Sequence, residues 1–303
     1  MPEVDLEPEI LAAIHSLRRA LRRASVALRR DLPWVGHDDP WAIFVSEVML
    51  QQTSTTRVIE PWRRFMATYP TPASCASAPL SDVLRLWKGL GYPRRAKSLR
   101  DAAQTMVEDF EGGVPSTSQD LRRLPGVGPY TANAVASFAF HRRVAVLDTN
   151  VGRVISRAVA NRPLGATEAQ RLADSLLPRR EVAGFNQAMI DLGAQFCTKS
   201  PRCALCPVQR HCRWRCVGGP DPAPRSAGVS RPQSPFAGSD RQVRGRIMAA
   251  LGAGPVSRRA LDHHLSDVDG ARRTALLGQL AREGLVSIGQ RRVALSGDDA
   301  TRH

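Results

Sequence analysis

The stretch Leu124-Pro125-Gly126-Val127-Gly128-Pro129-Tyr130-Thr131-Ala132 decides how this chain folds. Two glycines with a proline on either side cannot lie inside a regular helix, so they predict a tight backbone turn. The apolar run that continues to Phe140 predicts a helix that begins near Tyr130. Because the N–H groups of such a turn lie at the positive end of a helix dipole, the turn suits a phosphate group.

A lone carboxylate follows this turn and helix. Asp148 stands eighteen residues after Tyr130, at the end of the apolar segment in Val146-Leu147-Asp148-Thr149-Asn150. The turn and the carboxylate together predict a unit that holds DNA by its phosphates and directs Asp148 at it. The simpler interpretation is that Asp148 and Asn150 cap a helix, which both residue types commonly do.

The charge of the chain favours a polyanionic partner. Lys and Arg number 43 against 28 Asp and Glu in 303 residues, a formal net charge of +15. An arginine-rich proteome would produce the same excess without any nucleic acid, so charge alone leaves both interpretations open. The sequence contains no run of about 18 apolar residues and no signal-peptide pattern. We therefore expect a cytoplasmic monomer, associated with the nucleoid in a bacterium, without membrane contact.

Hydrophobic spacing predicts an all-α region over residues 1–215. Apolar residues recur at helical spacing over residues 6–31, and a second helix is expected from Trp41 to about Thr53. No sustained alternation typical of strands occurs before the C-terminal region. Residues 216–239 are rich in Gly, Pro, Ser and Arg, which predicts a flexible linker.

The last segment, residues 240–303, is predicted to form a small α+β domain. Helices are expected at residues 241–251, 258–265 and 271–283, followed by a hairpin around Gly289-Gln290. Three helices and a hairpin are the layout of a winged helix, a fold often used on DNA.

One ionisable side chain, Glu47, occurs in the second predicted helix among apolar neighbours such as Phe44, Val45 and Val48. Apolar surroundings disfavour the charged form of a carboxyl and would raise its pKa. The alternative is that Glu47 lies on the solvent face, which is the commoner position for a helical glutamate.

Five of the six cysteines lie within residues 197–216. The spacing Cys197-x5-Cys203-x2-Cys206-x5-Cys212 predicts four thiolate ligands. Zinc and iron–sulfur clusters both accept four thiolates, whereas the absence of a long insert between the pairs favours a cubane [4Fe-4S] cluster. Arginines between these cysteines would present positive charge to phosphates.

Taken together, these features resemble the helix-hairpin-helix (HhH-GPD) DNA glycosylase superfamily, and within it the MutY-type adenine DNA glycosylases. The resemblance covers residues ~25–215 and implies a two-lobed helical core with a [4Fe-4S] loop at residues 197–212. It rests on the four cysteines and on the motifs Val45–Thr53, Leu86–Tyr92, Leu124–Thr131, Leu147–Val151 and Phe185–Met189.

This resemblance implies excision of adenine that is mispaired with 8-oxoguanine or guanine in double-stranded DNA, after the nucleotide is flipped out of the stack. Adenine leaves only when its ring is protonated, and Glu47 would be the acid that supplies the proton. The sugar becomes an oxocarbenium-like cation, which the carboxylate of Asp148 would stabilise.

The resemblance also assigns the neighbours of these carboxylates. Bifunctional relatives resembling endonuclease III carry a Schiff-base lysine where this chain has Tyr130, so we expect a monofunctional enzyme with Tyr130 beside the active site. Asn150 would orient the catalytic groups. The residues expected to contact DNA are Gly126, Val127 and Gly128 in the turn, Leu50, Gln52 and Thr53 at the opposite base, and Tyr92 as a wedge in the stack. Core packing is the alternative for Leu50 and Tyr92.

The chain departs from the family pattern at three places. The gap between Cys197 and Cys203 is one residue shorter than usual, and Pro93 replaces a second tyrosine. Residues 240–303 are also too few for the pyrophosphohydrolase-like domain that helps the family recognise 8-oxoguanine, so the preference for that base is the part of the substrate prediction with least support.

The sequence leaves two other functions open. A mismatch glycosylase for thymine or uracil opposite guanine would not need the acid Glu47 in the same way, and a non-catalytic DNA-binding protein would need neither carboxylate.

Overall fold

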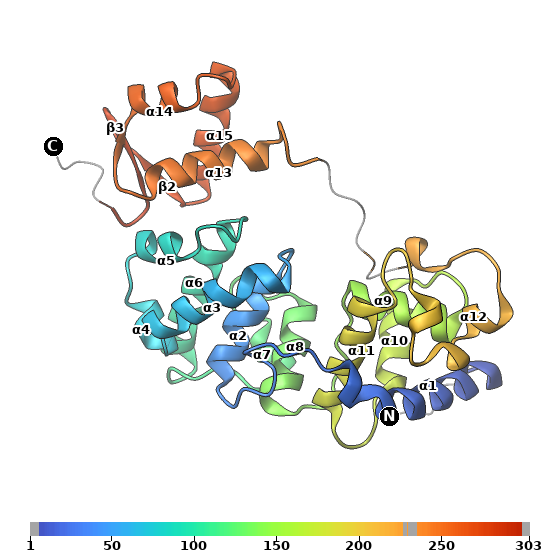
Figure 1. Ribbon diagram of the computed structural model, residues 1–303. Coiled ribbons are helices and arrows are strands. Elements are labelled where there is room, and N and C mark those ends of the chain that lie inside the picture. The colour runs from blue at the N-terminus through green and yellow to red at the C-terminus, as the bar shows by residue number, and fades with distance from the viewer. Residues whose placement is uncertain (1–5, 227–228, 230–234, 299–303) are drawn as a thin grey trace. The chain divides into compact units, whose positions relative to one another are not determined.

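The computed structural model describes residues 6–226, 229 and 235–298, which divide into two compact units (Figure 1). Unit 1 comprises residues 1–38, 116–118 and 128–232, and unit 2 comprises residues 39–115, 119–127 and 233–303. Both units are mostly helical, and within the described residues the first strand begins at Val256. The predicted all-α region followed by a small α+β segment is therefore confirmed.

Unit 1 is built from one long amphipathic helix and several shorter ones. The predicted helix over residues 6–31 is α1 (Pro8–Leu28), and the helix expected near Tyr130 is α8 (Pro129–Phe140). The rest of the unit consists of α9 (Thr149–Ile155), the π-helical turn η1 (Ser156–Ala160), α10 (Ala166–Leu176), α11 (Val182–Gln195), η2 (Cys203–Leu205), η3 (Gln209–His211), α12 (Arg213–Val217) and η4 (Ala223–Arg225).

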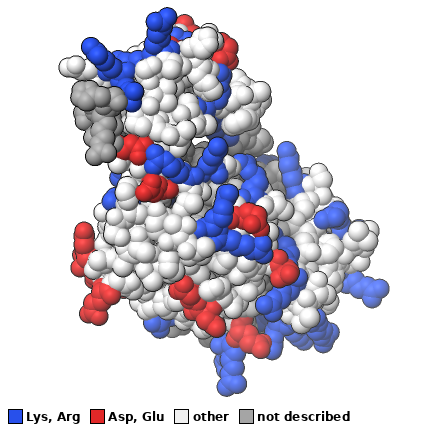
Figure 2. Space-filling model, turned by 60° about the vertical axis from the view of Figure 1, so that its left-hand side comes forward, with Lys and Arg blue, Asp and Glu red and all other residues white. Residues whose placement is uncertain are grey.

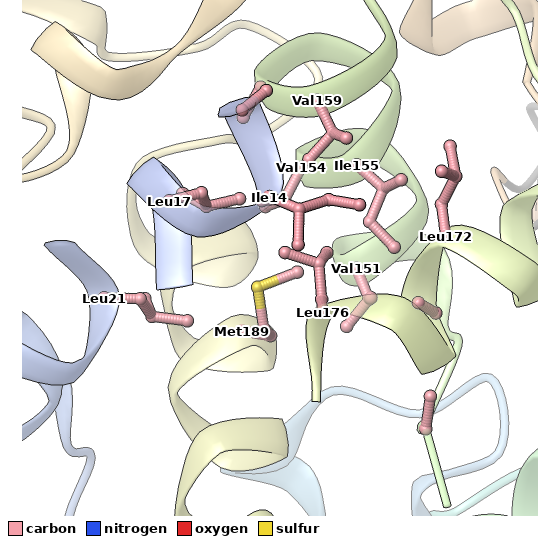
Figure 3. Close-up of a cluster of buried hydrophobic side chains, with 14 of the residues drawn as sticks. Ile14, Leu17, Leu21, Val151, Val154, Ile155, Val159, Leu172, Leu176 and Met189 are labelled. Carbon is pink, nitrogen blue, oxygen red and sulfur yellow. The ribbon is translucent and has the colours of Figure 1, made fainter. Parts of the chain in front are cut away.

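The hydrophobic core of unit 1 forms where α1 packs against α9, η1, α10 and α11 (Figure 3). Leu17 and Leu21 of α1 are fully buried, and Val151 and Met189 face them from α9 and α11. Burial of each such side chain contributes roughly 1.5–3 kcal/mol. This core fixes the start of α9, where Asp148 lies.

Unit 2 contains the apolar helix α2 and the elements around it. All residues of α2 (Pro40–Leu50) from Trp41 to Met49 are buried. The helix ends three residues before the predicted Thr53, because Gln52 adopts a left-handed backbone conformation with φ 57°. The following helices are α3 (Thr55–Thr68), α4 (Pro72–Ala76), α5 (Leu80–Leu86) and α6 (Arg94–Asp109), and the short α7 (Ser118–Leu121) has residues in both units.

The C-terminal part of unit 2 has three helices and a three-stranded antiparallel sheet of order β1-β3-β2. The expected hairpin pairs Val286 with Leu295, and a short first strand that the sequence pattern did not predict pairs Val256 with Val293. The elements are α13 (Asp240–Leu251), β1 (Val256–Ser257), α14 (Arg258–His264), α15 (Gly270–Arg282), β2 (Val286–Ile288) and β3 (Arg292–Leu295).

The segment expected as a flexible linker, residues 216–239, is folded in its first half. Ala223 is 1% exposed, and the Ser226 hydroxyl accepts a hydrogen bond from Leu164 N at 3.2 Å. Residues 227–228 and 230–234 of the segment lie outside the described residues. Across the described chain, no helix has the length and apolar content needed to span a bilayer.

Candidate functional site

The glycine–proline turn has the tight geometry that its sequence predicts. Gly126 has φ 76°, a conformation that favours glycine. A Cβ on Gly126 would lie 2.6 Å from Ser98 Cβ, so this position also requires the absence of a side chain. Gly128 is the N-cap of α8, with Pro129 directly after it, and Val127 is buried. The turn therefore presents backbone N–H groups at a helix start, as a phosphate site needs.

Glu47 is a buried carboxyl in the middle of α2, with 5% of its surface exposed. Its neighbours Phe44, Val48 and Met49 are buried as well. The solvent-face alternative is therefore wrong. A buried carboxyl in such surroundings is a candidate acid, because the apolar environment favours the protonated form.

Asp148 is the N-cap of α9, and its two carboxylate oxygens accept separate hydrogen bonds. Oδ1 accepts from Val151 N at 2.7 Å, and Oδ2 accepts from the Asn150 side-chain amide at 2.6 Å. Burial raises the pKa of the Asp148 carboxyl, against the opposing effect of these bonds and of the Arg153 charge. Asp148 thus caps α9, which was the simpler interpretation of its sequence position. The two hydrogen bonds also fix the orientation of its carboxyl group.

Asn150 is itself held by Arg153, a residue that the sequence analysis did not single out. Arg153 Nη2 donates to Asn150 Oδ1 at 2.6 Å and to Gly193 O at 3.0 Å. Its Nε donates to the backbone carbonyl of Cys197 at 2.7 Å. A hydrogen-bonded path therefore runs from Asp148 to the first predicted cysteine ligand. The spacing of Asn150 and Arg153, three apart on one helix, is the signal that could have indicated their contact.

The four predicted cysteine ligands line one small cavity of about 30 Å³. Among the described residues, no three His, Cys, Asp or Glu side chains lie close enough to hold a single metal ion. The four thiols are therefore spread around a space rather than gathered at one point. The cavity is lined by Cys197, Cys203, Cys206 and Cys212, together with Arg157, Trp214 and neighbouring residues, and does not include the exposed Cys216.

Arg157 is a buried charged side chain of this cavity, which Arg215 also lines, and no sequence motif indicates the place of Arg157 there. It is 1% exposed and donates from Nη1 to Cys197 Sγ at 3.3 Å. Its Nε and Nη2 bind the two oxygens of Asp221 at 2.8 and 2.6 Å. The folded first half of the expected linker, which contains Asp221, thus fastens an arginine against the cysteine segment.

The loop before α6 brings Tyr92 into an unusual backbone conformation, φ 48°. Beneath it lies the buried Arg95, whose guanidinium stacks 5.6 Å from the Tyr92 ring centroid and 5.3 Å from that of Trp87. Burial lowers the pKa of Arg95 to about 10. Arg95 Nη2 also donates to the Leu90 and Gly91 carbonyls, 3.0 and 3.1 Å away.

The same arginine ties this loop to the end of α2. Arg95 Nη1 donates to Val48 O at 3.0 Å and Met49 O at 2.8 Å, and Nη2 donates to the Thr53 hydroxyl at 3.0 Å. The structure thus brings together the Glu47 helix, Thr53 and the Tyr92 loop. Leu50 is half-buried at the helix end, and Gln52 is exposed after it.

The predicted site residues belong to both units. Glu47, Leu50, Gln52, Thr53, Tyr92, Gly126 and Val127 lie in unit 2, whereas Gly128, Tyr130, Asp148, Asn150 and the four cysteines lie in unit 1. Tyr130 is half-buried in the first turn of α8.

Residues 45–179 match the family model of the HhH-GPD superfamily base excision DNA repair proteins. Over 297 residues, the chain is 44% identical to an adenine DNA glycosylase of Mycobacterium tuberculosis, with 95% of both chains covered. The chain belongs to the adenine DNA glycosylase family within this superfamily. It is also 42% identical to the adenine DNA glycosylase of Mycolicibacterium smegmatis over 282 residues, with 90% of this chain and 94% of that protein covered. The human adenine DNA glycosylase is 41% identical over 202 residues, 62% of this chain and 37% of the human one.

Solved structures confirm the fold of this family in the chain. A thermostable thymine-DNA glycosylase is similar with a TM-score of 0.63 and 27% identity, covering 68% of this chain and 97% of that one. A covalent endonuclease III–DNA intermediate is similar with a TM-score of 0.60 and 26% identity, covering 67% and 97%. The mostly helical HhH-GPD fold expected from the sequence motifs is therefore present.

Proposed function

We propose that this adenine DNA glycosylase of base excision repair removes adenine mispaired with 8-oxoguanine or with guanine in duplex DNA. The observation that carries the proposal is the burial of Glu47, 5% exposed in an otherwise apolar helix. An enzyme that releases adenine needs an acid that keeps its proton near neutral pH, and burial of a carboxyl provides this property.

The first step is assigned to Glu47 as a general acid. Glu47 donates its proton to the adenine ring of the flipped nucleotide, and the bond between C1′ of the sugar and the base breaks. The base leaves with the bonding electron pair and the added proton, so that it departs as neutral adenine.

Asp148 stabilises the cation that remains on the sugar. Its carboxylate is held by Val151 N and by Asn150, so it requires little reorganisation when positive charge develops at C1′. Water then adds to C1′, and its proton returns to the Glu47 carboxylate. The product is an abasic site in an unbroken strand, because Tyr130 stands where a lyase would need an amine.

The DNA-holding role is assigned to the turn and to the elements around Arg95. Backbone N–H groups at Gly126 and Gly128 would bind a phosphate. Val127 N donates to Leu124 O at 3.2 Å and so would support the shape of the turn. Tyr92 would enter the stack as a wedge, and Leu50, Gln52 and Thr53 would contact the opposite base. Basic side chains spread over the face shown in Figure 2 support attraction of the DNA backbone.

The four cysteines around the cavity are proposed to hold a [4Fe-4S] cluster. The donor set fits, since all four thiols face one space and Arg157 donates a charge-assisted hydrogen bond to Cys197 Sγ. When bound, the cluster would cross-link the segment from Cys197 to Cys212. We also propose that the enzyme acts as a cytoplasmic monomer and that residues 240–298 form a winged-helix-like domain.

An excision assay on three duplexes tests the function. Purified protein is incubated with DNA carrying adenine opposite 8-oxoguanine, adenine opposite guanine, or thymine opposite guanine, and the products are resolved with and without alkali. We expect alkali-dependent breaks in both adenine duplexes and none in the thymine duplex. Failure to release adenine from either adenine duplex would refute the proposal, and breaks without alkali would refute the monofunctional mechanism.

A further inference from the structure

Four arginines gather at one end of the C-terminal sheet: Arg258, Arg259, Arg291 and Arg292. Their positions are fixed by backbone pairing. Arg292 is paired with Ser257 across β1 and β3, and Arg258 N donates to Arg291 O at 3.0 Å. We call these four residues the arginine cluster.

We call residues 240–298 the C-terminal module. The arginine cluster differs from most of the other arginines in this module in its ion pairing. No ion pair between described residues includes a member of the cluster. Asp262, the acidic residue nearest to Arg258 and Arg259 in sequence, instead pairs with Arg273 at 3.3 Å. The module's other ion pairs are Arg244 with Glu283, Arg246 with Asp267, and Arg272 with Asp240. Most of the arginine charge elsewhere in the module is therefore neutralised, with the exposed Arg282 also outside these ion pairs, whereas the cluster gathers at one place four arginines without an ion pair to a described residue.

The arginine cluster lies at the start of β3. The module is attached to the helices of unit 2 at the other end of this strand, near Asp298. Arg85 of α5 binds Asp298 at 2.6 Å and donates from Nε to Gly252 O at 3.0 Å. A Cβ on Gly297 would lie 3.0 Å from Leu80 N, so the chain after β3 lies directly against α5. β3 is four residues long and spans roughly 13 Å at ~3.3 Å per residue, so the cluster lies at the end of the strand that is away from this attachment.

The start of α13 lies beside the proposed wedge. Arg241 Nη1 lies 3.3 Å from the Tyr92 hydroxyl. A duplex that receives Tyr92 in its stack must therefore pass next to the module.

We propose that the C-terminal module is a second DNA-contacting surface, in which the arginine cluster binds phosphates of the same duplex beyond the base pairs that flank the mispair. This inference rests on the proposed function, because it takes Tyr92 to enter the duplex at the mispair. Duplex DNA is the partner favoured because unit 2 also carries the proposed wedge Tyr92, and Arg241 of the module lies beside it.

The test compares two full-length variants with equal loss of charge. The cluster variant is R258Q/R259Q/R291Q/R292Q. The control is R19Q/R23Q/R171Q/R179Q, which removes four exposed arginines of unit 1 that are likewise absent from the ion pairs. Binding is measured by fluorescence anisotropy as a function of salt, on a duplex of about 30 base pairs with 2′-fluoroadenosine opposite 8-oxoguanine. Each lost phosphate contact lowers the slope of log affinity against log salt by about 0.9.

We expect the cluster variant to bind the long duplex about tenfold more weakly and with a slope lower by about 2 or more, whereas the control stays close to wild type. On a duplex of about 10 base pairs centred on the mispair, the cluster variant and wild type should bind alike. Replacing the four arginines by lysine should restore binding of the long duplex, because the charge is retained.

Two outcomes would overturn the inference: equal binding of the long duplex by the cluster variant and the control, or an equal loss on both duplex lengths. Single-turnover excision at saturating enzyme separates this question from the proposed function. The cluster variant should excise adenine at the wild-type rate, whereas an error in the proposed function would leave wild type itself without activity. A matching thermal unfolding temperature confirms that the variant is folded.

Discussion

At the scale of single residues, Asp148 combines a structural and a chemical role. It caps α9, and burial raises the pKa of its carboxyl despite the hydrogen bonds from Val151 and Asn150. A carboxylate that must be ionised to stabilise a cation is thus kept in a place where ionisation is unfavourable.

Replacement of Asp148 by asparagine should therefore stabilise the fold and abolish the reaction. The Asp148 carboxyl has a higher pKa in the folded protein than in the unfolded chain, where it is about 3.9. The stability linked to the protonated carboxyl is therefore fully present below about pH 3.9. It is lost as pH rises through the pKa of the folded state. Asparagine is neutral throughout and remains a good N-cap. D148N should unfold at a higher temperature than wild type near pH 7, should lose this advantage below about pH 4, and should excise adenine about 100- to 1000-fold more slowly.

Thermal unfolding followed by circular dichroism across pH, with single-turnover excision alongside, measures both effects. A variant that is less stable than wild type at neutral pH would show that the hydrogen bonds to the carboxylate outweigh the effect of burial.

The two turn glycines provide a residue-scale comparison within one motif. A Cβ at Gly126 meets Ser98 at 2.6 Å and φ is 76°, whereas a Cβ at Gly128 meets nothing within 4 Å. G126A should therefore destabilise the protein by about 1–2 kcal/mol or more from the backbone conformation alone, and G128A should have little effect on stability. Chemical denaturation of the two variants measures the difference. Equal stability of G126A and G128A would contradict the geometry described for this turn.

At the scale of elements, Arg95 joins the end of α2 to the loop that carries Tyr92. Its five carbonyl and hydroxyl partners would lose a buried donor if the guanidinium were removed. Unsatisfied buried groups cost about 1–3 kcal/mol each, although neighbouring groups can relax toward water. The geometry of the proposed wedge therefore depends on a residue that need not touch DNA.

R95M should lower the free energy of unfolding by about 3–5 kcal/mol, the loss typical of a broken buried charged network. The matched control is R94M at the exposed neighbour, for which we expect a change within about 0.5 kcal/mol. Urea denaturation of both variants checks the prediction. If R95M were as stable as R94M, Arg95 would not be holding these elements together.

Motifs with a strong local signal could be predicted at this scale, and buried arginines could not. The turn at Gly126, the start of α8 and the hairpin around Gly289 follow from residue types whose backbone preferences are local. Arg95 and Arg157 lie in helical segments where an arginine normally indicates a solvent face, and their partners are distant in sequence. The sequence alone leaves the burial of Glu47 open for the same reason, because only packing of α2 on all sides distinguishes it from a surface glutamate.

At the scale of the whole molecule, the catalytic assignment draws on two compact units. Unit 1 fixes Asp148 through α9 and its core, and unit 2 buries Glu47 in α2. Composition and cysteine spacing indicated a DNA-binding protein with a cluster, and the motifs placed the chain in its family. The folding of residues 221–226 against Arg157 could not be predicted, because their composition is that of a linker and the Arg157–Asp221 pair is a long-range contact.

The central claim is that Glu47 supplies the proton for adenine release, and the E47Q variant tests it most directly. Glutamine retains the size and polarity of the side chain but cannot act as an acid, so single-turnover excision from the adenine–8-oxoguanine duplex should fall by at least about 100- to 10,000-fold. Binding of the same duplex should remain near the wild-type level, which shows that the site is intact. Excision by E47Q at a rate close to that of wild type would contradict the account.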